Sequence, residues 1–191
     1  DPGSAPDKIA LTVEVVEKST GQITFSVGYS TTEKVVGSIG PQERNFMGKG
    51  QNVRINTTLS FTRQQLDFSF TEPYFMGLPI SAGVDAFATK LDNTEISSYK
   101  SEQLGGALRL GFDLDEYSSL NFKYGLQWQR INGIDEDEAS PAVIASQGER
   151  WKSTLGTTYT WDNLDNPVLP TSGFRGQLDG EVAGLGGDTY Y

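Results

Sequence analysis

The side chains that most often carry out chemistry are scarce in this chain, and those present favour a structural role. The 191 residues include no cysteine and no histidine, which excludes thiolate nucleophiles, disulfides, the common zinc ligands and the usual general base. Four carboxylates, Asp67, Asp113, Asp179 and Glu181, lie in segments that also carry arginine and lysine. This pattern favours an ion-pair network over a catalytic acid–base pair, so we predict neither an enzyme nor a bound cofactor.

The acidic residues gather in loops, most clearly in the run Asp135–Glu138. A carboxylate-rich loop can bind Ca²⁺, but a run of like charges is more often a solvated loop. We favour the solvated loop and predict no metal site. The formal net charge of −10 also argues against nucleic acid as a partner.

Alternation of apolar and polar residues is the strongest signal in the sequence. In the run from Leu120 to Gln129 it is clearest, because apolar residues return at every second position. A period of two predicts strands with one apolar and one polar face, and no stretch approaches the ~20 apolar residues of a membrane-spanning helix. The predicted strands are Gly21–Ser30, Lys34–Gln42, Gln51–Phe61, Gln65–Thr71, Ile80–Lys90, Tyr99–Asp113, Ser119–Ile131, Arg150–Trp161 and Gly173–Ala183.

Two folds accommodate such strands. In an outer-membrane barrel the apolar face meets lipid and the polar face lines the lumen, whereas in a soluble sandwich the apolar faces of two sheets pack together. Trp128, Trp151, Tyr159 and Trp161 lie near strand ends, as an interfacial aromatic girdle requires, and the segments follow one another without a long crossover. We therefore predict an all-β fold, the N-terminal part of an antiparallel up-and-down transmembrane β-barrel.

The connections between the predicted strands alternate in type. Every second one is a turn rich in glycine, proline and aromatic residues, while the others are polar and include two long loops, Leu91–Ser98 and Asn132–Glu149. This asymmetry is typical of outer-membrane barrels, which have short periplasmic turns and longer outer loops. The first strand starts on the side of the tight turns, where Ile9–Val16 predicts the last strand of a soluble module. We expect residues 1–19 to be the C-terminal end of that module and its connector, and 20–191 to be the N-terminal half of the barrel.

The turn motifs extend this prediction to a family. They occur in order over nearly the whole chain: Val15–Ile23, Gly28–Thr31, Glu43–Gln51, Thr71–Phe75, Asp115–Tyr117, and Asp162–Pro167 with Pro170–Gly173. The ordered set resembles the BamA-type insertase superfamily of outer-membrane assembly factors. The resemblance implies a POTRA-like end for residues 1–19 and the N-terminal half of a 16-strand barrel for the rest, in the outer membrane of a Gram-negative bacterium.

The resemblance also implies a function and its partners. In such proteins a client strand pairs with the exposed edge of the first barrel strand, which is β-augmentation of unpaired N–H and C=O groups. The partners implied are unfolded outer-membrane proteins, the lipid bilayer and accessory lipoproteins. The candidate edge residues are Gly21, Gln22, Ile23, Thr24, Phe25, Ser26, Val27, Gly28, Tyr29 and Ser30.

Other functions remain open at this stage. A polypeptide-translocating pore of the same superfamily would use the lumen in place of the edge, although the turn motifs favour the assembly factor. A soluble β-sandwich binding module is the alternative from another class. Gly28 either fits a crowded lumen or softens the register of the edge.

The tight turns supply a second set of candidate residues, whose predicted role is mainly architectural. Gly48 provides a positive φ, Pro73 ends a strand, and Tyr74 and Phe75 lie at the membrane rim. Because only about half of the family's barrel is present, both outer strands are expected to have open edges, and we predict self-association through them. The rim residues are Phe46, Gly48, Glu72, Pro73, Tyr74, Phe75, Pro167 and Pro170.

Overall fold

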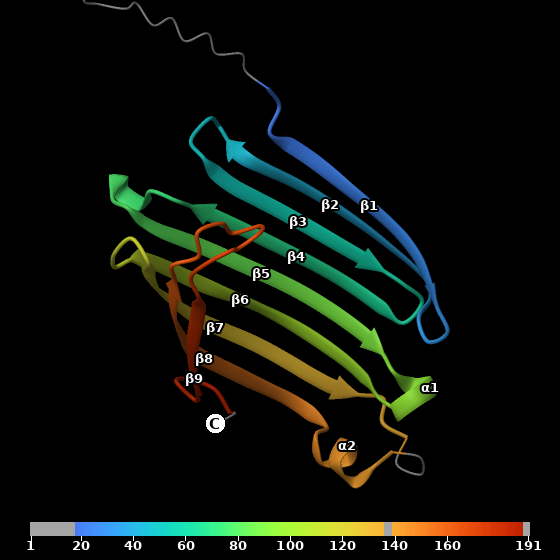
Figure 1. The fold of residues 1–191 in the computed structure, drawn as a ribbon. Coiled ribbons are helices and arrows are strands. Elements are labelled where there is room, and N and C mark those ends of the chain that lie inside the picture. The colour runs from blue at the N-terminus through green and yellow to red at the C-terminus, as the bar shows by residue number, and fades with distance from the viewer. Residues whose placement is uncertain (1–17, 136–138, 189–191) are drawn as a thin grey trace, which may run out of the picture.

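The computed structural model describes residues 18–135 and 139–188, and its strands form one open sheet. Nine strands follow one another in sequence order, each antiparallel to the next (Figure 1). They are β1 (Gly21–Ser30), β2 (Lys34–Phe46), β3 (Gln51–Leu59), β4 (Arg63–Glu72), β5 (Ile80–Asp92), β6 (Lys100–Asp113), β7 (Ser118–Asn132), β8 (Gly148–Asp162) and β9 (Arg175–Ala183). The predicted all-β fold of nine strands is confirmed.

The largest difference from the predicted bounds lies at the end of β2. This strand continues to Phe46, beyond the predicted end at Gln42, because Phe46 pairs with Gln51 across a tight turn. The pairing shifts register between Glu43 and Phe46, so the extra length is a bulged strand end. Phe46 therefore closes a strand, where the sequence predicted a turn residue.

Within the described residues, neither face of the sheet packs against another layer. Among the described residues no hydrophobic side chain is buried, and the large apolar side chains are exposed or half-exposed. The register places Leu108 opposite Val84 on one side and opposite Tyr124 on the other, so apolar residues form continuous rows across the sheet. We call this apolar side the outer face. A sandwich would bury these rows, so the sandwich alternative is wrong.

The connections alternate between two rims of the sheet, as the sequence predicted, but each rim includes one long connection, 163–174 on one and 133–147 on the other. The connections 47–50, 73–79, 114–117 and 163–174 form one rim, the turn rim, from which β1 starts. The opposite loop rim carries two short helices, α1 (Thr94–Ser97) and α2 (Pro141–Ala145), in the loops after β5 and β7 (Figure 1). In the part of the chain that the structure describes, no helix has the length and apolar character to cross a membrane. The predicted strand Ile9–Val16 and most of the acidic run, residues 136–138, lie outside the described residues.

Candidate functional site

Aromatic residues on the outer face mark the height of its apolar band. Trp151 in β8 lies directly opposite Trp128 in β7, and further along β8 the Trp161 ring lies 6.0 Å from the Tyr117 ring. The two tryptophans of β8 are about ten residues apart, or ~33 Å at ~3.3 Å per residue. A strand tilt of ~40° reduces this to a height of ~25 Å, which matches the apolar band of outer-membrane barrels.

The opposite face is polar and concave. A single hollow is lined by polar-face residues from β4 to β9, among them Thr71, Arg109, Lys123, Thr158 and Asp179. Residues from strands this far apart in the sheet can line one hollow only because the sheet curls toward this face. The curvature of the sheet is visible in Figure 1. We call this side the lumen face.

Arg109 ties three strands together on the lumen face. Its Nε donates to Asp85 Oδ2 at 2.7 Å, and its Nη2 donates to Asp85 Oδ1 at 2.9 Å, to Ser69 Oγ at 3.0 Å and to Thr71 Oγ1 at 3.1 Å. Gly83 leaves room for the guanidinium, because a Cβ there would lie 2.8 Å from Arg109 Cζ. The four residues Arg109, Asp85, Ser69 and Thr71 form what we call the lumen clasp, which fixes β4, β5 and β6 in register.

The lumen clasp differs in detail from the predicted ion-pair network. Sequence reasoning named Asp67 and Asp179, but the described hydrogen bonds of these carboxylates come from neutral partners, Gln65 for Asp67 and both Thr158 and Gln177 for Asp179. Asp85, the partner of Arg109, was missed. Its position within the alternating segment Ile80–Lys90 was the available signal.

β1 is an edge strand whose backbone groups can be assigned to one side or the other. Its pairing with β2 is unbroken at Pro41, although proline has no N–H, so Pro41 must direct its backbone away from β1. Backbone groups alternate sides along an antiparallel strand. Thr24 and Ser26 and the other even-numbered residues of β1 therefore bond to β2, and the odd-numbered residues direct their N–H and C=O groups to the open edge.

The residues with free backbone groups are also those whose side chains lie on the outer face. The side chains of Ile23, Phe25, Val27 and Tyr29 are 61%, 69%, 83% and 74% exposed, in that order. Tyr124, in the middle of the sheet, is 39% exposed. A Cβ at Gly28 would meet no atom of the described residues within 4 Å, so no neighbour in this part of the sheet requires a glycine here. The four edge residues are Ile23, Phe25, Val27 and Tyr29.

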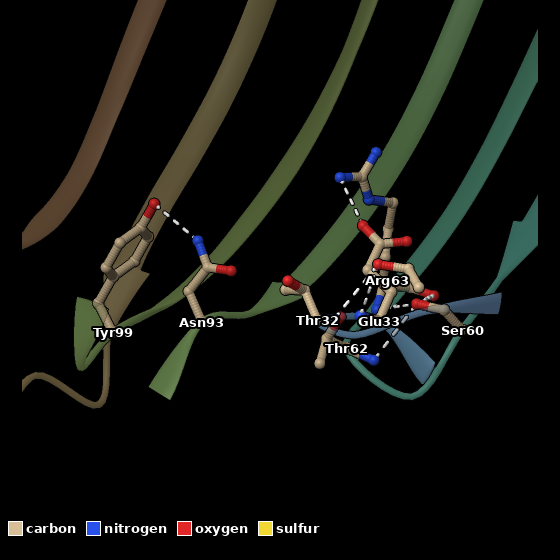
Figure 2. Close-up of polar contacts among 8 residues, drawn as sticks. Thr32, Glu33, Ser60, Thr62, Arg63, Asn93 and Tyr99 are labelled. Carbon is tan, nitrogen blue, oxygen red and sulfur yellow. Dashed lines mark hydrogen bonds and ion pairs between the residues drawn. The ribbon is translucent and has the colours of Figure 1, made fainter. Parts of the chain in front are cut away.

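Both ends of the β1–β2 hairpin are anchored. At the loop rim, Arg63 Nη2 lies 2.8 Å from Glu33 Oε1, which joins the β1–β2 turn to the start of β4 (Figure 2). At the turn rim, Gln42 Nε2 donates to Asn52 Oδ1 at 3.0 Å, which joins β2 to the start of β3. The edge is thus held in place while its outward backbone groups are left without a strand partner among the described residues.

The predicted rim residues fall into two groups. Gly48 adopts the predicted positive φ of 70°, and β4 ends at Glu72 directly before Pro73. Glu72 connects the turns on either side, because it accepts from Gln51 Nε2 at 2.6 Å and from the Tyr74 N–H at 3.0 Å. Phe46, Gly48, Glu72, Pro73, Tyr74 and Phe75 therefore lie in or beside two linked connections of the turn rim, those after β2 and after β4. Pro167 and Pro170 belong instead to the β8–β9 turn, at the other end of the sheet.

Asp165 braces the β8–β9 turn. Its carboxylate accepts from the Thr171 hydroxyl and from the backbone N–H groups of Thr171 at 2.9 Å and Ser172 at 3.0 Å. The hydrogen bond from the Thr171 hydroxyl, followed by those from the two backbone N–H groups, holds the pKa of Asp165 far below its usual range. All of these donors stabilise the ionised carboxylate.

The lowered pKa predicts an acid-resistant turn. The stabilisation is fully present above the unfolded pKa of ~3.9 and is lost only as the pH falls through the lower native pKa. Lowering the pH from 7 to 4 should therefore leave the Thr171 and Ser172 amide chemical shifts of the protein in micelles unchanged. The Asp165→Asn variant, which has no carboxylate, is the control and should show displaced shifts at every pH. A midpoint near pH 4 in the unsubstituted protein would contradict this prediction.

An open sheet with a lipid-facing outer face, a polar lumen face and aromatic residues at both rims is the wall of a transmembrane β-barrel. Residues 45–191 match the Omp85 superfamily domain. The chain belongs to the Omp85 superfamily.

Individual relatives agree with this assignment. The outer membrane protein assembly factor BamA of Neisseria meningitidis is 27% identical over 97% of this chain and 25% of its own length. BamA of Nitratidesulfovibrio vulgaris is 29% identical over 98% of this chain and 23% of its own. A SAM50-like protein of Drosophila melanogaster is 26% identical over 77% of this chain and 34% of its own.

A solved structure agrees on the fold. BamA from Haemophilus ducreyi lacking POTRA domains 1–3 superposes with a TM-score of 0.66 and 24% identity, over 90% of this chain and 35% of that one. The chain spans about a quarter of the length of the two BamA relatives. Family and fold place it in the outer membrane of a Gram-negative bacterium.

Proposed function

We propose that this chain is the N-terminal barrel wall of a factor that assembles β-barrel proteins in the outer membrane. Client strands would pair with the free edge of β1. The BamA and SAM50-like relatives support the assembly role. The observation that carries the edge mechanism is that the outward backbone groups of β1 have no strand partner among the described residues. The hairpin that bears them is held to β4 at the loop rim and to β3 at the turn rim.

The physical argument concerns the membrane. An unpaired N–H or C=O group in hydrocarbon costs several kcal/mol, so a strand edge at membrane depth strongly favours pairing. A client strand that hydrogen-bonds to Ile23, Phe25, Val27 and Tyr29 satisfies these groups, and its own far edge becomes the next template. No covalent chemistry is needed. Accessory lipoproteins and the POTRA-like role of residues 1–19 remain part of this proposal.

Site-specific cross-linking tests it against the pore. A photoreactive amino acid is placed in the full-length protein at Phe25 or Val27, and in separate variants at the lumen positions Arg109, Lys123 or Lys152. An unfolded outer-membrane barrel protein is then supplied as client. We expect strong cross-links at Phe25 and Val27 and weak ones in the lumen. Cross-links confined to the lumen positions would instead support polypeptide translocation.

A further inference from the structure

The pairing between β2 and β3 is interrupted in the middle of both strands. It runs without a gap as far as Ile39 and resumes at Gln42 with the same offset, but Gly40 and Pro41 have no partner in β3. On its other side β2 pairs with β1 through ten consecutive residues. Among the described strands, β2–β3 is the one ladder interrupted within its length; the others are continuous.

Pro41 is the cause of the gap. Its nitrogen faces β3, where the shared offset places Ile55 directly opposite, and a proline has no N–H to donate to the Ile55 carbonyl. Both missing pairs, at Gly40 and at Pro41, are those that require this donor. Proline is normally confined to edge strands and bulges, but β2 is an interior strand. Pro41 lies in β2 directly opposite Ile23 of β1.

Neighbouring features add to the weakness of this junction. Gly40 precedes Pro41, and glycine in a strand interior contributes no side-chain packing. The register shift between Glu43 and Phe46 lies on the far side of Pro41. The hairpin β1–β2 is therefore better joined within itself than to β3, while its two ends stay anchored at the rims.

We propose that Pro41 is a positioning residue for client pairing: it lets the β1–β2 hairpin twist against β3 as a unit, at the level where β1 begins. This inference rests on the proposed function. A client strand and the first strand differ in twist, and a template that can adjust its angle can accept many clients. The interrupted ladder allows this adjustment without breaking the bonds between β1 and β2.

Restoring the missing donor tests the proposal. Pro41→Val provides an N–H opposite the Ile55 carbonyl and suits a strand. In the full-length protein we expect hydrogen exchange at the Val53, Ile55 and Thr57 amides to slow about fivefold to tenfold. The rate of client assembly should fall several-fold, while cross-links between client and Val27 remain. Ile39→Ala, which shortens an outer-face side chain on the same strand but adds no donor, is the control and should change neither rate.

A reversible lock provides a second test. This chain has no cysteine, so the double variant Gly40→Cys with Asn56→Cys can form one disulfide across the gap. The two positions face each other but exchange no backbone hydrogen bonds. Oxidation should slow assembly, and reduction should restore it. The matched lock at Ser38 and Thr58, where the ladder is intact, should have no effect.

Each possible outcome decides the matter. Unchanged amide exchange in Pro41→Val would show that the gap is not a point of motion. Slower exchange with undiminished assembly would show that the motion is not used, and either result overturns the inference. If the protein that retains Pro41 forms no cross-link between the client and position 27, the proposed function itself is refuted.

Discussion

Val27→Pro is expected to block client pairing while leaving the sheet of this protein intact. The N–H of Val27 faces the open edge and its side chain is 83% exposed, so proline here removes a donor that no other strand of the described sheet uses. Each ~1.4 kcal/mol is a tenfold change in affinity. An unsatisfied partner in hydrocarbon costs more than that, so client cross-linking and assembly should both fall about tenfold or more.

The control lies one residue away. The N–H of Ser26 faces β2, and the Ser26 side chain is hydrogen-bonded to Ser38. Ser26→Pro should therefore disrupt the β1–β2 ladder and lower the urea concentration at which the barrel unfolds, whereas Val27→Pro should leave that concentration unchanged. The same alternation holds for Phe25 and Thr24. Equal effects of the two prolines on assembly, with equal unfolding, would show that the orientation of the edge is assigned wrongly.

Loss of the lumen clasp should produce the second large effect. Arg109→Met removes both bonds to Asp85 and leaves that carboxylate without its cation. Buried charges left unpaired cost several kcal/mol, but both side chains of this pair are about a third exposed. We expect the free energy of unfolding in micelles to fall by about 1–2 kcal/mol.

Two comparisons make the result specific to the clasp. Arg54→Met removes the same charge from the same face, at a residue for which the described structure holds no ion pair, and should change stability little. Gly83→Ala keeps every charge but places a Cβ where the guanidinium lies, and should reproduce part of the loss. If Arg54→Met and Arg109→Met unfold at the same urea concentration, the clasp does not stabilise the sheet.

The strands could be predicted from sequence because both of their determinants are local. A period of two fixes which residues share a face, and Gly48 and Pro73 mark where strands end, so the strands and their order could both be predicted. Their ends were less certain, as the bulged extension of β2 to Phe46 shows. That extension depends on a pair with Gln51 across the turn, which periodicity does not encode.

The lumen clasp and the edge orientation could not be predicted in the same way. Arg109 and Asp85 are 24 residues apart in sequence, and they meet only because β5 and β6 pair in one register out of several that the pattern allows. The sequence contains Pro41 but does not say whether its nitrogen faces β1 or β3. Only the strand pairs on both sides of β2 determine that direction, and with it the strand that lacks a donor.

No hydrophobic side chain is buried among the described residues, so this sheet depends on its surroundings to cover its apolar face. A water-soluble domain carries its own apolar interior, whereas here the acyl chains of the lipid occupy that place. The bilayer therefore provides the apolar contacts that a hydrophobic core provides in a soluble protein. Lengthening or shortening its fatty acids should affect this protein as cavity-forming or overpacking substitutions affect a globular enzyme.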